Sequence, residues 1–182
     1  MKKSLIILFF FVSIVEASAS IKNKIIRNLE NTDNLTFNFE QNINGKTQNG
    51  NCILSFQKKI FCQYNLKNNK ILVSNGKSIV IKTSASYYLY PLERTPLNLI
   101  LNKDFLLKKI KILNERKIDD KFINFRFSEN DFEINLFFDF IDYNLIGWQT
   151  TDIYQNLSIT FLSSVKKNQQ LEDGLFNLPK QN

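Results

Sequence analysis

Few residues of this chain could perform chemistry, and the residue types that it lacks exclude most catalytic sites. The 182 residues contain no histidine, which rules out Ser-His-Asp and Cys-His nucleophilic sites. A complete phosphate-binding Gly-x4-Gly-Lys-Ser/Thr loop and a Gly-x-Gly-x-x-Gly motif are also missing. Two carboxylate pairs, Asp119 with Asp120 and Asp139 with Asp142, could act as acid and base on a glycan. Such neighbours are far more often turn residues, so we expect no enzyme, no metal and no cofactor.

The two cysteines predict a structural bond. Cys52 and Cys62 are the only ones in the chain, and they lie in apolar stretches on either side of the turn-like Gln57-Lys58-Lys59. This spacing predicts a disulfide across two neighbouring strands, worth about 2–3 kcal/mol in an oxidising compartment. A metal site is the alternative, but two cysteines without histidine do not supply a tetrahedral ligand set.

Residues 1–19 have the features of a secretory signal peptide. Two lysines provide a charged start, an apolar run follows, and Ala17-Ser18-Ala19 forms a small-residue cleavage site. A membrane anchor is the alternative, but a spanning helix needs about 20 apolar residues, and this run breaks at Glu16. Because no cysteine follows the cleavage site to be acylated, we expect an exported, soluble, unlipidated protein with one domain at residues 20–182.

The chain carries a modest excess of positive charge. Its 24 Lys and Arg against 17 Asp and Glu give +7, and +6 remains without the predicted signal peptide. The basic residues are spread along the chain without a long tract, which is typical of a solvated surface. Lysines beside aromatics, as in residues 58–61, resemble a platform for single-stranded nucleic acid. Export argues against that partner, and we expect no nucleic acid.

Hydrophobic periodicity predicts one helix followed by a long sheet. Residues 20–31 place Ile21, Ile25 and Leu29 on one stripe of an amphipathic helix. Farther on, apolar residues alternate with polar ones, which predicts about ten antiparallel strands in total. The clearest alternating segments are residues 35–39, 52–56, 60–64, 71–73, 78–82, 125–127, 132–138, 145–148 and 157–161.

The middle of the chain predicts helices between two halves of the sheet. Pro91 and Pro96 interrupt the strands, and leucines follow. We expect a short helix with Pro96 near its first residue and a second helix capped by Asp104. These few helices are too short to cover the whole apolar face of a long sheet. The sheet therefore either curves around a packed core or leaves a cavity for a hydrophobic ligand. Periodicity alone does not decide between the two.

Several segments occur in the order found in one family of carrier proteins. They are a Phe-x-Gln at residues 39–41, a strand after a glycine at 50–54, a hairpin at 72–79, a Thr-Pro-Leu helix at 95–101 and a closing segment at 168–179. In this order the chain resembles the LolA-type periplasmic carriers of outer-membrane lipoproteins. The resemblance covers essentially the whole predicted mature chain.

The resemblance implies a fold and a function. The fold is mainly β (α+β), a curved antiparallel half-open β-barrel with short helices lidding an apolar cavity. The function is to bind the acyl chains of lipoproteins in that cavity and to carry them through the periplasm from the inner to the outer membrane. The implied partners are acylated lipoproteins and an inner-membrane ABC-type release complex, with an outer-membrane lipoprotein receptor as a further candidate, and we expect a monomer.

The resemblance and the apolar pattern together indicate site residues. We expect an acyl cavity with a lid over it. The expected cavity residues are Leu35, Phe37, Phe39, Leu54, Phe56, Ile60, Tyr64, Val73, Ile79 and Ile81, and the expected lid residues are Leu97, Ile100 and Leu101.

The chain departs from the family pattern at two places. The family has an Arg-Pro after the second strand, whose Arg holds the lid, where this chain has Lys58 and Lys59 as candidate latch residues. Lysine is a point donor rather than a planar fork, so a different latch is an alternative. The family's Trp on the next strand corresponds to Cys62. Two other functions stay open: a periplasmic carrier of another lipid, such as a glycolipid or phospholipid, and an exported sheet protein with a filled core.

Overall fold

The computed structural model describes residues 20–151 and 156–181. The predicted signal peptide at residues 1–19 therefore lies outside the described residues. The elements are α1 (Ile21–Glu30), β1 (Asn34–Ile43), β2 (Lys46–Ser55), β3 (Lys59–Tyr64), β4 (Ile71–Asn75), β5 (Ser78–Lys82), β6 (Tyr87–Pro91), the 3-10 helix η1 (Leu92–Arg94), α2 (Leu97–Ile100), α3 (Lys103–Ile112), β7 (Arg116–Ile118), β8 (Phe122–Glu129), β9 (Phe132–Asp139), β10 (Leu145–Thr151) and β11 (Leu157–Lys167).

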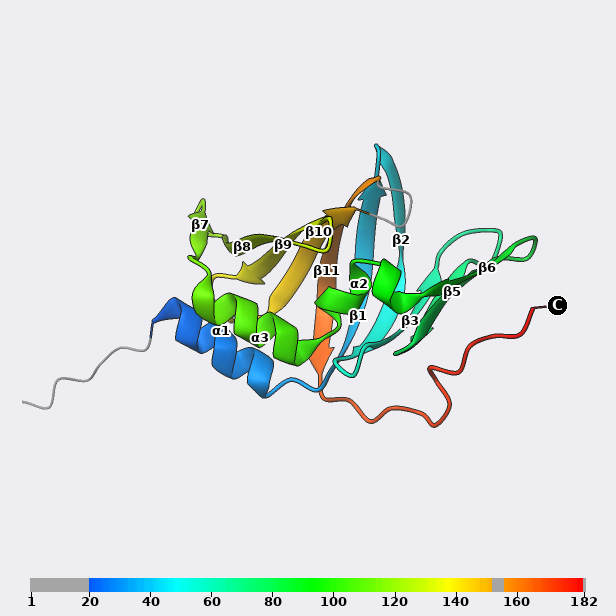
Figure 1. The fold of residues 1–182 in the computed structure, drawn as a ribbon, viewed down its shortest axis with the longest axis horizontal. Helices are drawn as coiled ribbons and strands as arrows, with labels where there is room; N and C mark the ends of the chain where they lie inside the picture. Colours follow the sequence, from blue (N-terminus) through cyan, green and yellow to red (C-terminus); the bar gives the residue numbers. More distant parts are fainter. Residues whose placement is uncertain (1–19, 152–155, 182) are drawn as a thin grey trace, which may run out of the picture.

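The described strands form one antiparallel sheet of eleven, in the order β6-β5-β4-β3-β2-β1-β11-β10-β9-β8-β7 (Figure 1). The last strand, β11, returns to lie beside the first, β1, so neighbouring positions come from opposite ends of the sequence. β6 and β7 are the two edges and do not pair with each other, so the sheet stays open. This open sheet with a few short helices confirms the expected fold class.

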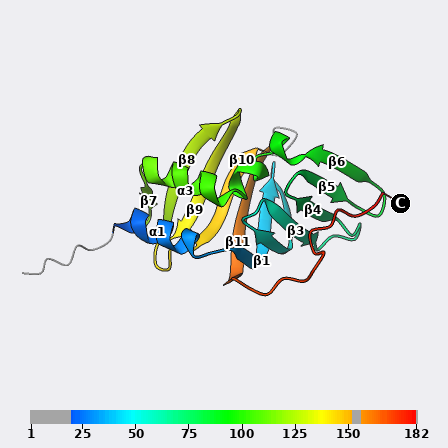
Figure 2. The same cartoon turned by 60° about the horizontal axis from the view of Figure 1, so that its bottom comes forward.

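The helical segment connects the two edges of the sheet. Because η1, α2 and α3 follow edge strand β6 and precede edge strand β7, the chain must cross a face of the sheet between them. Figures 1 and 2 show α3 beside α1 on that face, with the short α2 nearer the middle of the sheet. We call this the concave face and the opposite one the convex face.

Local sequence sets the helix boundaries. Ser20 caps α1, its side chain accepting a hydrogen bond from the Asn23 amide at 3.3 Å. Asn102 caps α3 by accepting from the Phe105 amide at 3.2 Å, so the expectation that Asp104 is the cap was wrong. Asp104 lies instead in the first turn, where its negative charge interacts favourably with the helix dipole. Pro96 is the residue directly before α2.

The two long helices cover only one half of the concave face. Lys109 on α3 forms an ion pair of 2.7 Å with Glu129 at the end of β8. Asn28 on α1 donates a hydrogen bond of 2.9 Å to the Asn144 side chain before β10. Both helices are thus held over β8, β9 and β10, while the half formed by β2 to β6 has no comparable helix above it (Figure 2).

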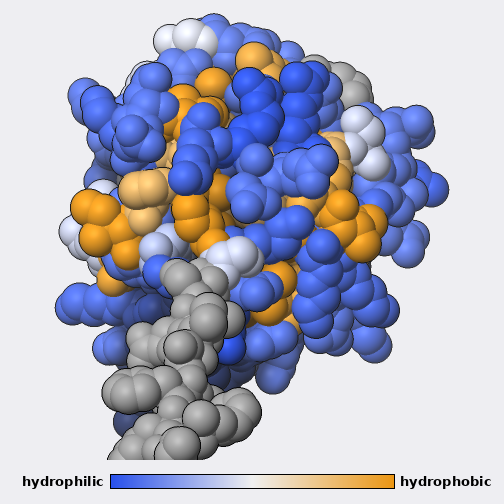
Figure 3. Space-filling view, turned by 90° about the vertical axis from the view of Figure 1, so that its left-hand side faces the viewer, coloured by the Kyte–Doolittle hydropathy of each residue, from blue (hydrophilic) through white to orange (hydrophobic). Residues whose placement is uncertain are grey.

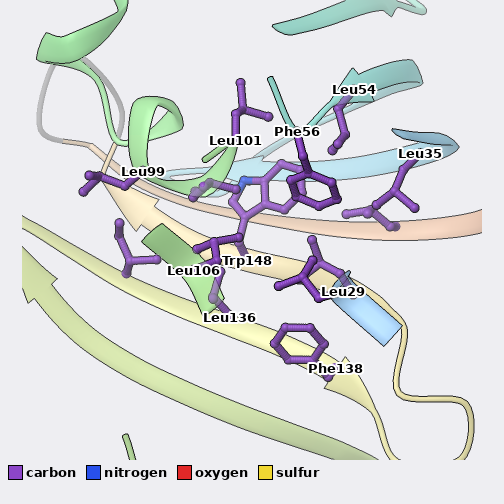
Figure 4. Packing of buried hydrophobic residues seen from close by; sticks show 14 of the residues in the cluster. Leu29, Leu35, Leu54, Phe56, Leu99, Leu101, Leu106, Leu136, Phe138 and Trp148 are labelled. Atoms are coloured by element: carbon purple, nitrogen blue, oxygen red, sulfur yellow. The ribbon is translucent and has the colours of Figure 1, made fainter. Parts of the chain in front are cut away.

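The core lies between these helices and the sheet. Phe125 and Phe138 make an edge-to-face contact at 5.9 Å, and both are fully buried. Trp148 packs edge-on against Phe37 with ring centroids 6.3 Å apart. Figure 4 shows the labelled core residues, which come from α1, α2, α3 and six different strands or turns: Leu29, Leu35, Leu54, Phe56, Leu99, Leu101, Leu106, Leu136, Phe138 and Trp148.

The surface at the α1, α3 and β7 end of the molecule is mostly hydrophilic, with separated apolar spots (Figure 3). At the opposite end the C-terminal segment passes along the sheet toward β5 (Figures 1 and 2). Lys82 donates a hydrogen bond of 2.8 Å to the Lys180 carbonyl oxygen there. No helix in the described part of the chain is long and apolar enough to cross a membrane.

Lys103 at the start of α3 holds the turn between α1 and β1. Its Nζ donates to the Thr32 carbonyl oxygen at 2.9 Å, to the Glu30 carbonyl oxygen at 3.3 Å and to the Asp33 carboxylate at 2.8 Å. Asp33 is largely exposed, so the carbonyl contacts matter more than the ion pair. No local pattern in the sequence indicates this contact, because its partners lie about seventy residues earlier.

We therefore expect Lys103→Met to lower the free energy of unfolding by about 1–2 kcal/mol, because two carbonyl oxygens lose a charged donor. Asp33→Asn removes only the exposed partner's charge and should cost less than about 0.5 kcal/mol. Lys108→Met, on an exposed position of the same helix, is the matched control. Urea unfolding measures all three, and equal stabilities of Lys103→Met and the control would contradict this role.

Candidate functional site

The uncovered half of the concave face contains a pocket of about 270 Å³. It is bounded by β1 to β6, β10 and β11 and closed at one side by the start of α2. Its apolar lining comprises Phe39, Ile43, Cys52, Ile60, Cys62, Tyr64, Leu72, Ile79, Ile81, Tyr88, Pro96, Leu97 and Trp148. Its polar lining comprises Gln41, Lys70, Thr95, Thr150, Thr151, Ser158 and Thr160.

Two other hollows are larger but do not suit an apolar ligand. One, of about 550 Å³, lies along β1, β2 and β11, and the other, of about 500 Å³, lies beside the C-terminal segment. Both are more open than the concave pocket, and polar or charged side chains make up much of their linings. A hydrophobic ligand is best buried in an enclosed, mostly apolar site, so the concave pocket is the candidate.

One strand shows why the pocket begins where it does. Leu35 and Phe37 of β1 point to the concave face and are buried in the core. Phe39, Gln41 and Ile43 point to the same face because side chains alternate along a strand, yet they line the pocket. Since the face is the same throughout, the change from core to pocket along β1 reflects where the helices stop.

The disulfide forms part of the pocket wall. Cys52 and Cys62 are directly opposite each other in β2 and β3, and their Cα atoms are 4.1 Å apart. Adjacent Gly50 leaves no room for a side chain, because an added Cβ would lie 2.9 Å from the Phe39 ring and would collide with the Gln63 carbonyl oxygen. Phe39 in turn packs edge-on against Tyr64, with ring centroids 5.0 Å apart. The wall around the disulfide is therefore tightly packed.

A chain of hydrogen bonds crosses the pocket floor. Gln41 of β1 donates through Nε2 to the Ser158 and Thr160 hydroxyls of β11, each at 3.1 Å. The Tyr64 hydroxyl of β3 donates to the Gln41 Oε1 at 3.4 Å. Sequence reasoning missed Gln41, Ser158 and Thr160. The signal was a polar residue at an inward position of an otherwise apolar strand.

The sequence matches the model of one protein family, "Outer membrane lipoprotein carrier protein LolA", over residues 30–179. The chain belongs to the LolA family. Because that match spans most of the chain, the resemblance seen in separate segments is confirmed. Families of this type are carriers that bind their cargo rather than enzymes.

Solved structures with little sequence identity resemble this LolA-family chain. A LolA superfamily protein from Nitrosomonas europaea is 9% identical with a TM-score of 0.47, over 87% of this chain and 96% of that one. A putative outer membrane lipoprotein-sorting protein domain from Vibrio parahaemolyticus is 8% identical with a TM-score of 0.46, over 85% and 95%. The lipoprotein LppX from Mycobacterium tuberculosis is 9% identical with a TM-score of 0.42, over 83% and 96%. No curated protein matches the sequence.

Half of the cavity residues expected from the LolA resemblance line the pocket. These are Phe39, Ile60, Tyr64, Ile79 and Ile81, joined by the lid residue Leu97.

The other expected residues lie elsewhere, mostly in the packed core. Val73 lies on the convex face, where it pairs with Phe61 and Val80, and its neighbour Leu72 takes the inward position. An apolar run such as residues 71–73 does not reveal which member points inward. The residues buried in the core instead of the pocket are Leu35, Phe37, Leu54, Phe56, Ile100 and Leu101.

The α2 lid is attached to the sheet by main-chain atoms. The Lys58 amide donates to the Leu101 carbonyl oxygen at 3.2 Å, and Gln57 forms a β-bridge with Asn102. Lys58 has a φ of 64°, in the left-handed region, at this turn. Neither the Lys58 nor the Lys59 side chain makes a hydrogen bond or ion pair with a helix within the described residues. The attachment seen in this LolA-family chain thus comes from the backbone of the β2–β3 turn rather than from the expected lysine side chains.

Tyr64 gives the pocket a measurable pH dependence. Burial raises the pKa of its phenol well above the ordinary value. Its contribution to stability is therefore complete below the pKa of about 10 in the unfolded chain and is lost as the pH rises above it. Between pH 9 and pH 11, the free energy of unfolding should fall by about 1 kcal/mol less in Tyr64→Phe than in the wild type. Urea unfolding at the two pH values measures this, and parallel losses in both proteins would contradict it.

Proposed function

We propose that this protein is a periplasmic carrier that binds the acyl chains of lipoproteins and moves them from the inner to the outer membrane. The observation that carries the proposal is the mostly apolar, partly open pocket on the uncovered half of the concave face, in a chain of the LolA family. A filled core, the alternative raised by the strand pattern, agrees less well with such a pocket.

Carriage of this kind needs binding and release but no bond making. Burying acyl surface against the apolar lining supplies about 25 cal/mol per Å². Leu97 lines the pocket from α2, which is only four residues long. A helix of one turn has little stability of its own, so its position depends on the burial of Leu99 and Ile100 and on the main-chain contact of Leu101 with the β2–β3 turn. An acyl chain that displaces α2 must offset these contacts.

The proposed partners follow from this route. An inner-membrane ABC-type release complex would supply the acylated lipoprotein, and the outer membrane, with or without a receptor there, would accept it. We expect the carrier to act as a monomer, because residues of a single chain form the concave pocket.

A release assay tests the proposal. Membranes that contain a lipoprotein and its release complex are incubated with ATP and the purified protein, and the soluble fraction is then separated. We expect the lipoprotein to appear there in a 1:1 complex with this protein, and not when ATP is omitted. If no lipoprotein becomes soluble although the release complex hydrolyses ATP, lipoprotein carriage is wrong.

A second candidate function is carriage of another lipid. The polar side chains on the pocket floor favour it, because a purely alkyl ligand does not use them. Mass spectrometry of the ligands that leave the cell with the purified protein separates the two functions. Lipopeptides support lipoprotein carriage, and glycolipids or phospholipids support the second candidate.

A further inference from the structure

The two edges of the sheet differ in how well they are protected. β7 is only three residues long and exposes Arg116 and Lys117. A short, charged edge hinders pairing with a foreign strand. β6, the other edge, consists of Tyr-Tyr-Leu-Tyr-Pro at residues 87–91 and carries no charge (Figures 1 and 2). It therefore lacks the feature that protects β7.

Hydrogen bonds with β5 determine which main-chain groups of β6 point outward. The Thr83 amide donates to the Ser86 carbonyl oxygen at 2.9 Å, where the chain turns from β5 into β6. Bonded and non-bonded pairs alternate from there along an antiparallel ladder, so Tyr88 bonds with β5. Tyr87 and Leu89 occupy non-bonded positions and direct their N–H and C=O groups away from β5.

The other end of β6 has the same phase. The Leu92 amide donates to the Lys77 carbonyl oxygen at 2.9 Å, which again places Leu89 at a non-bonded position. Within the described residues, the main-chain groups of Tyr87 and Leu89 have no hydrogen-bond partner. Two N–H and two C=O groups are thus available along this edge.

Side chains on both faces of β6 are exposed as well. Tyr88 is 47% and Leu89 is 55% exposed, and they point to opposite faces because they are consecutive in a strand. A strand added next to β6 would place side chains beside both and remove part of their apolar surface from water. The edge therefore offers apolar contacts together with main-chain hydrogen bonds.

This edge adjoins the pocket. Tyr88 lines the concave pocket, and so does Ile81, its partner in β5. In a lipoprotein the acyl chain is covalently joined to the first residue, so the residues that follow must lie next to the pocket when the acyl chain is inside it. Tyr88 places β6 at the rim that these residues pass, and an extended segment of five residues matches β6 in length.

We infer that β6 binds the polypeptide segment that follows the acylated residue of the cargo, as an added β-strand. Main-chain hydrogen bonds hold this segment, and they do not depend on its side chains. The same edge therefore accepts lipoproteins of different sequence, as long as the segment is extended and has no proline at the bonded positions. This mode of binding rests on the proposed carrier function, because the acyl chain brings the segment to the edge.

N-methylation of a lipopeptide tests the strand pairing. The ligand is an N-lauroyl peptide of six serines, which displaces N-phenyl-1-naphthylamine from the protein below its micelle concentration. One version carries N-methyl groups on its second and fourth residues, and another on its third and fifth. Only every second N–H of an added strand faces its neighbour, so one version should bind about tenfold more weakly than the unmodified peptide and the other within about twofold of it.

Leu89→Pro tests whether β6 is the edge that binds. The substitution removes the outward N–H of Leu89 but no bond to β5, and proline is tolerated at such edge positions. The unmodified lipopeptide should bind about five- to tenfold more weakly, and laurate, which has no peptide, within about twofold of the wild type. The control is Leu89→Ala, which shortens the same side chain but keeps the N–H, and it should weaken the lipopeptide by no more than about threefold.

The outcomes separate strand pairing from the carrier function. Equal affinities of the two N-methylated versions, or equal binding of the lipopeptide by folded Leu89→Pro and Leu89→Ala, would overturn the pairing and leave the pocket as the acyl site. If circular dichroism shows that Leu89→Pro does not fold, the N-methylated ligands with the wild type decide alone. If the wild type sediments as a dimer that Leu89→Pro separates, a second copy occupies the edge and the inference is wrong. If the wild type binds neither the probe, laurate nor the lipopeptide, the carrier function itself fails.

Discussion

Replacing Leu72 by Asp is expected to weaken acyl-chain binding at least about a hundredfold, or about 2.7 kcal/mol. Leu72 lies on the concave face between Cys62 and Ile81 and lines the pocket. A carboxylate there would lose its water when an acyl chain covers it, and nothing in the apolar wall would replace that water. Displacement of N-phenyl-1-naphthylamine by a lipopeptide measures the affinity.

Ile71→Asp is the matched control for this prediction. Ile71 is the preceding residue of β4, is similarly half-buried, and points to the convex face opposite Gln63 and Lys82. Its replacement should change the affinity by no more than about twofold, because a strand directs successive side chains to opposite faces. If both variants bind equally well, or equally badly while folded, the pocket is not where the acyl chain binds.

Removing the disulfide should produce the largest loss of stability. The double substitution Cys52→Ala and Cys62→Ala is expected to lower the free energy of unfolding by about 2–3 kcal/mol, because the cross-link restricts a short loop in the unfolded chain. For a domain of this size the loss corresponds to a melting temperature about 5–10 °C lower. Differential scanning calorimetry measures it directly.

Chemical reduction provides the control for the disulfide. A phosphine reductant should lower the melting temperature of the wild type toward that of the double variant and leave the double variant unchanged. If the wild type under oxidising conditions melts with the double variant, the bond does not contribute to stability. If free thiols are found in the oxidised wild type, the pairing of Cys52 with Cys62 is wrong.

Local sequence patterns predicted much of the fold. Ile25 and Leu29 are buried on α1 as their spacing predicts, and β1 and β3 follow their alternation of apolar and polar residues. About ten strands were expected, and the described residues form eleven, because β7 is a three-residue edge strand with no apolar alternation. An alternating pattern indicates which side of a strand is buried. Because β7 buries neither side fully, it has no such pattern.

The site was less predictable, because its limits depend on contacts between distant residues. Leu35 and Phe39 look alike in the sequence and both are buried, yet only Phe39 also borders the pocket, which begins where the cover of α1 and α3 ends. Gln41 meets its partner Ser158 across the first and last strands, 117 residues apart. Neither relation leaves a local signal. The sequence therefore identified the face of the sheet but not which part of that face stays open.

Photo-crosslinking tests most directly whether an acyl chain lies in this pocket. A synthetic lipopeptide with a diazirine on its acyl chain is bound, irradiated and digested with the protein, and the labelled residues are mapped by mass spectrometry. We expect labels at Leu72, Ile79 and Ile81 on the concave face. Labels at Ile71 and Lys82 on the convex face instead, or no label on the folded protein, would contradict the carrier function proposed here.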